Sequence, residues 1–186
     1  GKWLDVSGTK IDTKQPYRLN LPSGKSIDMF FYDGPASRAV AFESLLARGE
    51  TFAHRLLEGF DKNLNTTQLV HIATDGETYG HHHKFGDMAL AYALHYIESS
   101  NQAKLTNYGE FLEKFPPTHE VEIFENTSWS CAHGIKRWRS DCGCNTGAGA
   151  GWNQAWRTPL RETLDWLRDI LAPAFREKAQ PLLKDP

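Results

Sequence analysis

The chain runs Gln68-Leu69-Val70-His71-Ile72-Ala73 and continues directly as Thr74-Asp75-Gly76-Glu77-Thr78-Tyr79-Gly80-His81-His82-His83. The first six residues are mainly apolar over a strand-sized length, which predicts a short buried strand. The ten residues that follow are polar and contain glycine, which is typical of a loop. In open α/β sheets, ligands bind beyond the carboxyl ends of the strands. The pattern therefore predicts a functional loop at the end of a strand.

The residues before this stretch predict a hairpin and two helices. Apolar runs at 17–21 and 27–32 flank Pro22-Ser23-Gly24-Lys25, which is typical of a hairpin turn. Asp33-Gly34-Pro35 predicts a helix start, because proline suits the first helical turn. This helix is expected to face the core with Val40, Phe42, Leu45 and Leu46. A second short helix is expected over 51–60.

The residues after the loop alternate between helix and strand patterns. A helix over 84–99 is expected to face the core with Met88, Ala91, Tyr92, His95 and Ile97. Asn107 and Glu110 occupy capping-box positions, which predicts a helix over 108–114. A strand is expected over 119–124. A last helix is expected to turn Leu160, Leu164, Leu167 and Leu171 inward. The alternation indicates an α/β fold.

Composition and charge exclude several classes of protein. The chain has a net charge of -2 and no basic cluster interleaved with aromatic residues, so the pattern of a nucleic-acid binder is absent. No apolar run approaches the roughly 18 residues of a membrane span, so no membrane partner is expected. All three cysteines lie between Cys131 and Cys144. This grouping favours a reduced, cytoplasmic setting over a disulfide scaffold.

The length of 186 residues predicts a single domain over 1–186. Within it we distinguish an N-terminal hairpin region at 1–26, a Cys/Trp-rich loop at 125–157 and a C-terminal helix at 158–180. Gly1 stands where a natural chain would carry Met, which indicates part of a longer protein. A homo-oligomer is left open, because unpaired strand edges in such a part would need cover.

Asp75 and Glu77 are the candidate catalytic carboxylates of the loop. In extended backbone, residues two apart point to the same face, so both side chains can enter one cleft. Two carboxyl groups in a closed pocket repel as anions, and one then keeps its proton and acts as a general acid. His81 and His82 would bond substrate hydroxyls or tune that acid. The alternative is a solvated turn in which Asp and Gly only shape the backbone.

The stretch 74–83 resembles the fourth sequence region of family-57 glycoside hydrolases, where glutamate follows an aspartate by two residues and Gly-His comes next. Phe31-Tyr32-Asp33-Gly34-Pro35 and Ser128-Trp129-Ser130-Cys131-Ala132-His133-Gly134 resemble the uncharacterised α-amylase/α-mannosidase-like branch of that family. The likeness extends from about residue 3 to residue 171. It implies an irregular (β/α)7 barrel followed by helices, so the chain is expected to be a partial (β/α)7-type barrel fragment with flanking helices.

The same resemblance implies the roles of the loop residues. Asp75 would be the general acid/base of a retaining mechanism on an α-glucan or another oligosaccharide, by hydrolysis or glucanotransfer. Glu77 and His81 would line the donor-sugar subsite. No cofactor is required for this chemistry.

The chain departs from the family pattern at the nucleophile. Family members carry it as a glutamate in a Trp-Leu-Pro-Glu-like segment, and their first strand has a His-containing signature; this chain has neither. Retention requires two carboxyl groups roughly 5 Å apart across the scissile bond. Glu77 projects from the same strand end as Asp75 and does not easily reach the opposite sugar face. We therefore expect the C-terminal part of a catalytic barrel region, catalytically incomplete in isolation.

Two other functions are compatible with the residues. Asp75, His81 and His83 offer metal-ligand types, as in a metal-dependent hydrolase or a polysaccharide deacetylase-like enzyme. A non-catalytic carbohydrate-binding module is the third reading. It would be favoured if the parent gene lacked a glutamate nucleophile upstream.

Cys131, His133, Cys142 and Cys144 match a Cys₃His zinc site in ligand type. The Cys-x-His and Cys-x-Cys pairs are tighter than the usual spacings, and Gly143 would give the second pair its turn. Three alternatives stand beside a structural zinc. The thiols can be small buried hydrophobes, they can lie near a sugar pocket without ligating, and His133 can bond substrate.

Four of the six tryptophans lie in the Cys/Trp-rich loop. Indole faces stack on the C–H faces of sugar rings, and we expect Trp129 at the pocket with Arg137 bonding hydroxyls. For Trp152 and Trp156 we expect packing of a helix against the barrel. Arg137-Trp138-Arg139 is alternatively a cation–π cluster without a substrate role.

Overall fold

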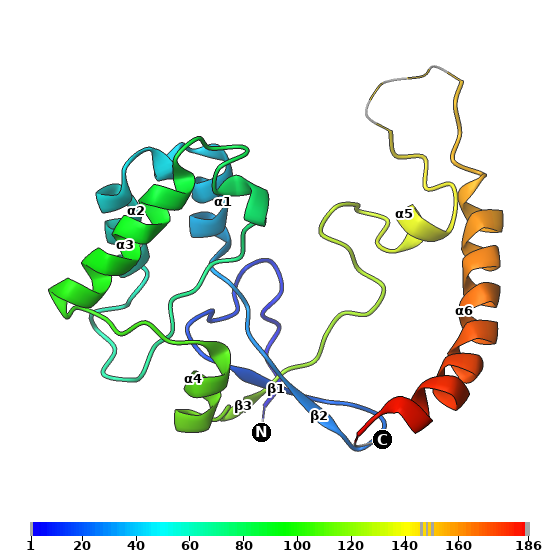
Figure 1. The fold of residues 1–186 in the computed structure, drawn as a ribbon, viewed down its shortest axis with the longest axis horizontal. Coiled ribbons are helices and arrows are strands. Elements are labelled where there is room, and N and C mark those ends of the chain that lie inside the picture. The colour runs from blue at the N-terminus through cyan, green and yellow to red at the C-terminus, as the bar shows by residue number, and fades with distance from the viewer. Residues whose placement is uncertain (1, 146, 148, 150, 185–186) are drawn as a thin grey trace. The chain divides into compact units, whose positions relative to one another are not determined.

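The computed structural model describes residues 2–145, 147, 149 and 151–184. The chain forms two compact units, which divide between Glu122 and Ile123 (Figure 1). The single domain expected over 1–186 stays a prediction. None of the described helices combines the length and the apolar character that a membrane crossing requires.

The first unit contains a small mixed sheet of order β2-β1-β3. Strands β1 (Tyr17–Asn20) and β2 (Ser26–Met29) pair antiparallel, with Tyr17 opposite Met29. Gly24 takes a φ of 80° in the turn between them, so the predicted hairpin is confirmed. Strand β3 (His119–Glu120) pairs parallel with β1. It is shorter than the predicted strand over 119–124.

Helices make up most of the regular secondary structure of the first unit. They are α1 (Gly34–Phe42), η1 (Leu45–Ala47), α2 (Gly49–Leu57), η2 (Gly76–Thr78), α3 (Gly86–Ser100) and α4 (Tyr108–Lys114). The Asp33 carboxylate caps α1 by accepting from the Ala36 N–H at 2.9 Å, and the Asn107 side chain caps α4 through the Glu110 N–H at 3.0 Å. Both predicted helix starts are thus confirmed, because each depends on a local cap. The mixture of helices with a three-stranded sheet is compatible with the α/β class.

The core of the first unit lies where α2 packs against α3. Its buried apolar residues are Val40, Leu46, Phe52, Ala53, Ala89, Ala93 and Ile97. The predicted inward faces were partly wrong. Phe42 is 79 % exposed, and Met88 and Tyr92 are also exposed. α3 instead buries its small residues, because α2 approaches so closely that a Cβ on Gly49 would lie 2.7 Å from the Tyr92 Cβ.

Residues 68–73 form no strand, which corrects the prediction. The Leu69 N–H donates to the Lys14 carbonyl at 2.8 Å, and the His71 carbonyl accepts from the Asp33 N–H at 3.0 Å. The Ala73 N–H donates to the Ser37 hydroxyl at 3.1 Å. Successive residues therefore bond different neighbouring segments, and no ladder with a single partner can form.

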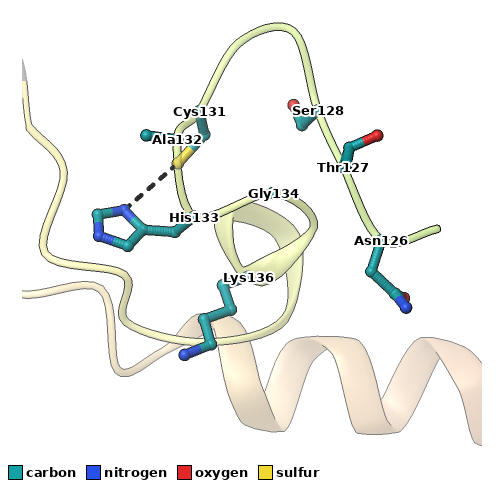
Figure 2. Close-up of a pocket in the computed structure, with 8 residues that line it drawn as sticks. All are labelled: Asn126, Thr127, Ser128, Cys131, Ala132, His133, Gly134 and Lys136. Atoms are coloured by element: carbon teal, nitrogen blue, oxygen red, sulfur yellow. Dashed lines mark hydrogen bonds between the residues drawn. The ribbon is translucent and has the colours of Figure 1, made fainter. Parts of the chain in front are cut away.

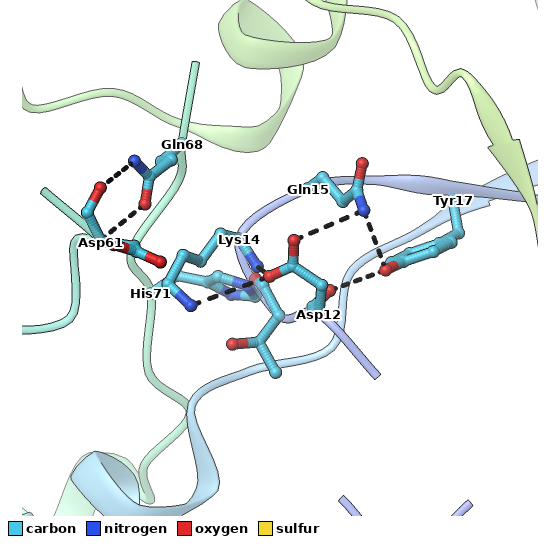
Figure 3. A network of polar contacts seen from close by, with 8 residues as sticks. Asp12, Lys14, Gln15, Tyr17, Asp61, Gln68 and His71 are labelled. Atoms are coloured by element: carbon cyan, nitrogen blue, oxygen red, sulfur yellow. Dashed lines mark hydrogen bonds and ion pairs between the residues drawn. The ribbon is translucent and has the colours of Figure 1, made fainter. Parts of the chain in front are cut away.

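His71 ties this segment to two others. Its Nε2 lies 3.1 Å from the Thr13 carbonyl and its Nδ1 lies 2.9 Å from the Tyr108 hydroxyl. Because a carbonyl only accepts, Nε2 carries the proton and Nδ1 accepts from the hydroxyl, so the neutral ring satisfies both bonds. Burial lowers the pKa of His71. Figure 3 shows the ring beside the Asp12–Tyr17 network and the Asp61–Gln68 pair.

The second unit has little buried apolar surface. It contains α5 (Lys136–Arg139), α6 (Arg157–Ala179) and η3 (Gln180–Leu182), and Pro173 lies inside α6 without ending it. The last helix is confirmed. The four leucines expected to face inward are between 41 % and 54 % exposed, so that expectation was wrong. Among the described residues of this unit, only Cys131 and Gly134 are buried.

The Phe52→Ala substitution is expected to destabilise the first unit by about 3–5 kcal/mol, because it removes a fully buried ring and leaves a cavity. The matched variant Phe42→Ala is expected to change stability by no more than about 0.5 kcal/mol, since that ring is exposed. Urea unfolding measures both. Equal effects would contradict the assignment of the core.

The stability of the first unit is expected to rise as the pH is raised towards about 6.5, the ordinary pKa of histidine, and to level off above it. The pKa of His71 is lower in the fold than in the unfolded chain, so the unfolded state binds more protons between the two values. The stabilisation is complete above the unfolded pKa and is lost as the pH falls. His71→Gln should flatten this dependence in urea unfolding. If the free energy of unfolding of the variant depends on pH as steeply as that of the wild type, the role of His71 is contradicted.

Candidate functional site

The loop over 74–83 is fixed from within by three of its residues. The Thr78 side chain is buried, the Tyr79 hydroxyl accepts from the Thr74 hydroxyl at 3.1 Å, and the His83 Nε2 donates to the Ala41 carbonyl at 3.0 Å. Backbone bonds close the turn: the Glu77 carbonyl accepts from the N–H groups of both His81 and His82, at 3.1 and 3.0 Å. The loop is thus a compact turn attached to α1.

The remaining polar side chains of the loop are exposed. They are Asp75, Glu77, His81 and His82. The rings of His81 and His82 meet edge to face, with centroids 4.9 Å apart. The predicted closed pocket with two repelling carboxylates is not formed by the described residues. The backbone turns into η2 at Gly76, so the alternation of an extended strand does not apply to Asp75 and Glu77.

Asp75, His81 and His83 are not brought together as metal ligands. Within the part of the chain that the structure describes, the one group of three or more suitable side chains lies in the second unit. The His83 Nε2 is engaged with the Ala41 carbonyl instead. The geometry therefore gives no support to a metal-dependent hydrolase centred on this loop.

The Cys₃His cluster comprises Cys131, His133, Cys142 and Cys144, whose ligand atoms all lie within 4.8 Å of one another. The Cys131 Sγ lies 3.8 Å from the Cys144 Sγ and 3.7 Å from the His133 Nδ1, and the Cys144 Sγ lies 3.3 Å from the same nitrogen. All three cysteines are free thiols. The sequence prediction that these residues meet is therefore compatible with the structure.

The thiols of the cluster influence one another. The Cys144 N–H faces the Cys142 sulfur and lowers the pKa of that thiol. The Cys131 thiol, hydrogen-bonded to Cys144, raises the pKa of the Cys144 thiol. Two residues that sequence reasoning missed also reach Cys142: the Gln154 Oε1 lies 3.4 Å and the Arg157 Nη1 lies 3.6 Å from its Sγ. The sequence contains no motif that would identify these two residues, because both belong to the segment that leads into α6 and lie at no characteristic spacing from the cysteines.

A cavity of about 400 Å³ lies beside the cluster. Figure 2 shows its wall, which includes Ser128, His133 and Lys136. Trp129 does not line it and is fully exposed. Arg137 donates to the Ser130 carbonyl at 3.1 Å. The substrate-binding roles of Trp129 and Arg137 stay predictions.

The other tryptophans of the loop are also exposed. Trp152 and Trp156 are not packed as expected, with 86 % and 58 % of their surface accessible. The cation–π contact in this region joins Arg157 to Trp156, at 5.7 Å, rather than Trp138 to its arginine neighbours. A second cavity, of about 300 Å³, lies in the first unit between Asp12, Gln68 and His119. No motif in the sequence predicted it.

Residues 4–123 match the family model of glycosyl hydrolase family 57. The chain belongs to glycosyl hydrolase family 57. The match contains the whole loop over 74–83 and ends at the boundary between the two units. The predicted family is confirmed, and the substrate class that it implies is carbohydrate. A domain of unknown function, DUF3536, matches residues 152–186. No curated protein matches the chain.

The two family matches leave residues 124–151 uncovered. All four members of the Cys₃His cluster lie in this uncovered segment. The family-57 match therefore carries information about the Asp75 loop and none about the cluster.

Gly134 is expected to tolerate no side chain. A Cβ there would lie 2.0 Å from the Asn126 carbonyl oxygen, and its φ of 60° adds strain of about 1–2 kcal/mol for other residues. Gly134→Ala should therefore break the bond from the Ile135 N–H to that carbonyl, now 3.1 Å. Hydrogen exchange at Ile135 measures the loss.

Gly143→Ala is the matched control for Gly134→Ala. Its φ is 75°, but nothing lies within 4 Å of the added Cβ. It should cost only the backbone strain and leave the exchange of Ile135 nearly unchanged. Equal acceleration in both variants would contradict the close approach of Gly134 to Asn126.

Proposed function

We propose that the chain supplies Asp75 as the general acid/base of a retaining glycoside hydrolase or glucanotransferase acting on α-linked glycans. Membership of glycosyl hydrolase family 57 supports the reaction class. The loop that carries Asp75 lies inside the matched residues. The proposal also assigns the chain to the α-amylase/α-mannosidase-like branch.

The observation that carries this proposal is that some residues of the loop fix its backbone while others face solvent. Thr78, Tyr79 and His83 hold the turn from within, whereas the carboxyl group of Asp75 stays exposed. A catalytic group needs such a support, because misplacement by about 1 Å costs much of the rate. Asp75 therefore projects from a turn whose conformation is held by hydrogen bonds.

Glu77, His81 and His82 are proposed as contacts to sugar hydroxyls. A carboxylate accepts hydrogen bonds and a neutral imidazole both donates and accepts, so together they match hydroxyl groups. The Glu77 carbonyl fixes the backbone of both histidines. This links the positions of the three side chains.

The nucleophile is proposed to lie outside residues 1–186. The sequence contains no Trp-Leu-Pro-Glu-like segment, and Glu77 sits on the same turn as Asp75. Retaining chemistry needs its two carboxyl groups on opposite faces of the sugar. Exposed apolar side chains on α1 and α3, such as Phe42 and Met88, support the idea that the first unit is part of a larger (β/α)7-type barrel.

Trp129 and Arg137 are proposed to bind sugar as well. The Trp129 indole is fully exposed and offers both faces for stacking. Arg137 uses one of its five N–H donors on the Ser130 carbonyl and keeps the others for hydroxyl groups. The three free thiols support a cytoplasmic location, because free thiols persist in reducing compartments.

The test is Asp75→Asn in the glycoside hydrolase that contains this chain. Loss of the general acid should lower kcat on an α-glucan by about 10²–10⁴-fold. An aryl glycoside with a good leaving group needs no protonation, so formation of its glycosyl-enzyme should be much less affected. Asp87→Asn is the control, since that exposed carboxylate lies in the first turn of α3. It should leave both rates unchanged.

The proposal fails if Asp75→Asn slows both substrates equally or neither. It also fails if the isolated chain hydrolyses an α-glucan at a rate that Asp75→Asn abolishes, because the nucleophile would then lie within the chain. A non-catalytic binding module is indicated if Trp129→Ala abolishes α-glucan binding while Asp75→Asn changes no rate.

A further inference from the structure

We propose that Cys131, His133, Cys142 and Cys144 bind one Zn²⁺ ion, and that this ion holds the second unit together. All four proposed ligands lie outside both family matches, and the site does not depend on the proposed glycosidase activity. The proposal rests on the geometry of the ligands, the turns that present them, the charge around them and the lack of any other core among the described residues.

Three of the four ligand atoms, those of Cys131, His133 and Cys144, have the spacing of a tetrahedral site. With Zn–S of about 2.3 Å and Zn–N of about 2.0 Å, a tetrahedron has S···S edges of about 3.8 Å and S···N edges of about 3.5 Å. The Cys131–Cys144 separation is 3.8 Å, and the two sulfurs lie 3.7 and 3.3 Å from the His133 Nδ1. Cys142 completes the group within the 4.8 Å limit.

Two glycine turns present the ligand pairs. Gly134 follows the Cys131–His133 pair with a φ of 60°, and its N–H donates to the Cys131 carbonyl at 2.9 Å. Gly143 separates Cys142 from Cys144 with a φ of 75°. Both turns need a positive φ, which glycine adopts without strain. Each pair can therefore chelate despite its short spacing.

The surrounding charge suits a zinc thiolate. When Zn²⁺ binds, the three thiols release three protons, and with a neutral histidine the complex carries a net charge of -1. Arg157 places its Nη1 3.6 Å from the Cys142 Sγ and offsets that charge. The same nitrogen donates to the Gln154 Oε1 at 2.6 Å, and the Gln154 amide donates to the Cys144 carbonyl. Such contacts orient the ligands of metal sites.

The described residues of the second unit form no apolar core that would replace the ion. Cys131 is its single buried apolar residue among those described. Units of this size with so little buried surface usually need a disulfide or a metal. No disulfide is formed by the three cysteines. A zinc ion would join the 131–144 segment to Gln154 and Arg157 at the start of α6.

Zinc fits better than other transition metals. Three cysteines and one histidine are an established ligand set of structural Zn²⁺ sites. The competing chemistry is a disulfide between Cys131 and Cys144, which would bring two sulfurs from 3.8 Å to about 2.05 Å. That outcome needs an oxidant and excludes zinc, so experiment separates the two.

The experiment measures the metal content of the chain, purified under reducing conditions without a polyhistidine tag. Elemental analysis should find about one zinc per chain. Cys142→Ser and His133→Ala should each lose it. His81→Ala and His82→Ala, which remove exposed imidazoles of the Asp75 loop, should keep it.

Two further measurements do not depend on the folding of a variant. Cobalt added to the metal-free wild-type chain should give the intense absorption of a tetrahedral cobalt thiolate. A chelator should make residues 123–157 sensitive to protease while residues 17–120 stay protected. The proposal is overturned if the wild-type chain holds no zinc and gives no cobalt spectrum, if zinc is lost with His81, or if Cys131 and Cys144 form a disulfide in reducing buffer.

Discussion

The close packing of α2 on α3 is the contact on which the first unit depends. It works because α3 presents Ala89 and Ala93, and α2 begins at Gly49, where a Cβ would meet Tyr92. α3 also starts directly after the Asp75 loop. Gly86 lies in the first turn of α3, where an added Cβ would be too close to Leu46 and Tyr79. The position of the loop is therefore set by how tightly two helices pack, since a shift of α3 would shift the loop with it.

Local signals predicted the parts of the fold that depend on neighbouring residues. The hairpin turn at Gly24, the helix start at Pro35 and the cap at Asn107 each involve residues within five positions of one another. The segment 68–73 was different, because the backbone groups of Leu69, His71 and Ala73 bond residues more than thirty positions away. An apolar run has the same pattern whether its partners form one strand or several unrelated segments. A ladder therefore could not be inferred from it.

The buried face of α3 was missed for a related reason. Hydrophobic periodicity weights bulky residues, so it favoured Met88 and Tyr92 over the alanines that α2 covers. The sequence predicted which residues belong to the candidate sites, namely those of the loop and the four cluster residues. The contacts of Gln154 and Arg157 with Cys142 were not, because they arise only when the segment before α6 folds back.

The uneven burial of the two units has a thermodynamic consequence. The first unit keeps a hydrophobic cluster around Phe52, whereas the second buries almost nothing apolar. The heat-capacity change on unfolding scales with apolar area exposed, so it should come almost entirely from the first unit. The calorimetric transition of the chain should then report mainly the unfolding of the first unit. A single melting temperature would describe the half that carries the Asp75 loop and say little about the half that carries the cysteines.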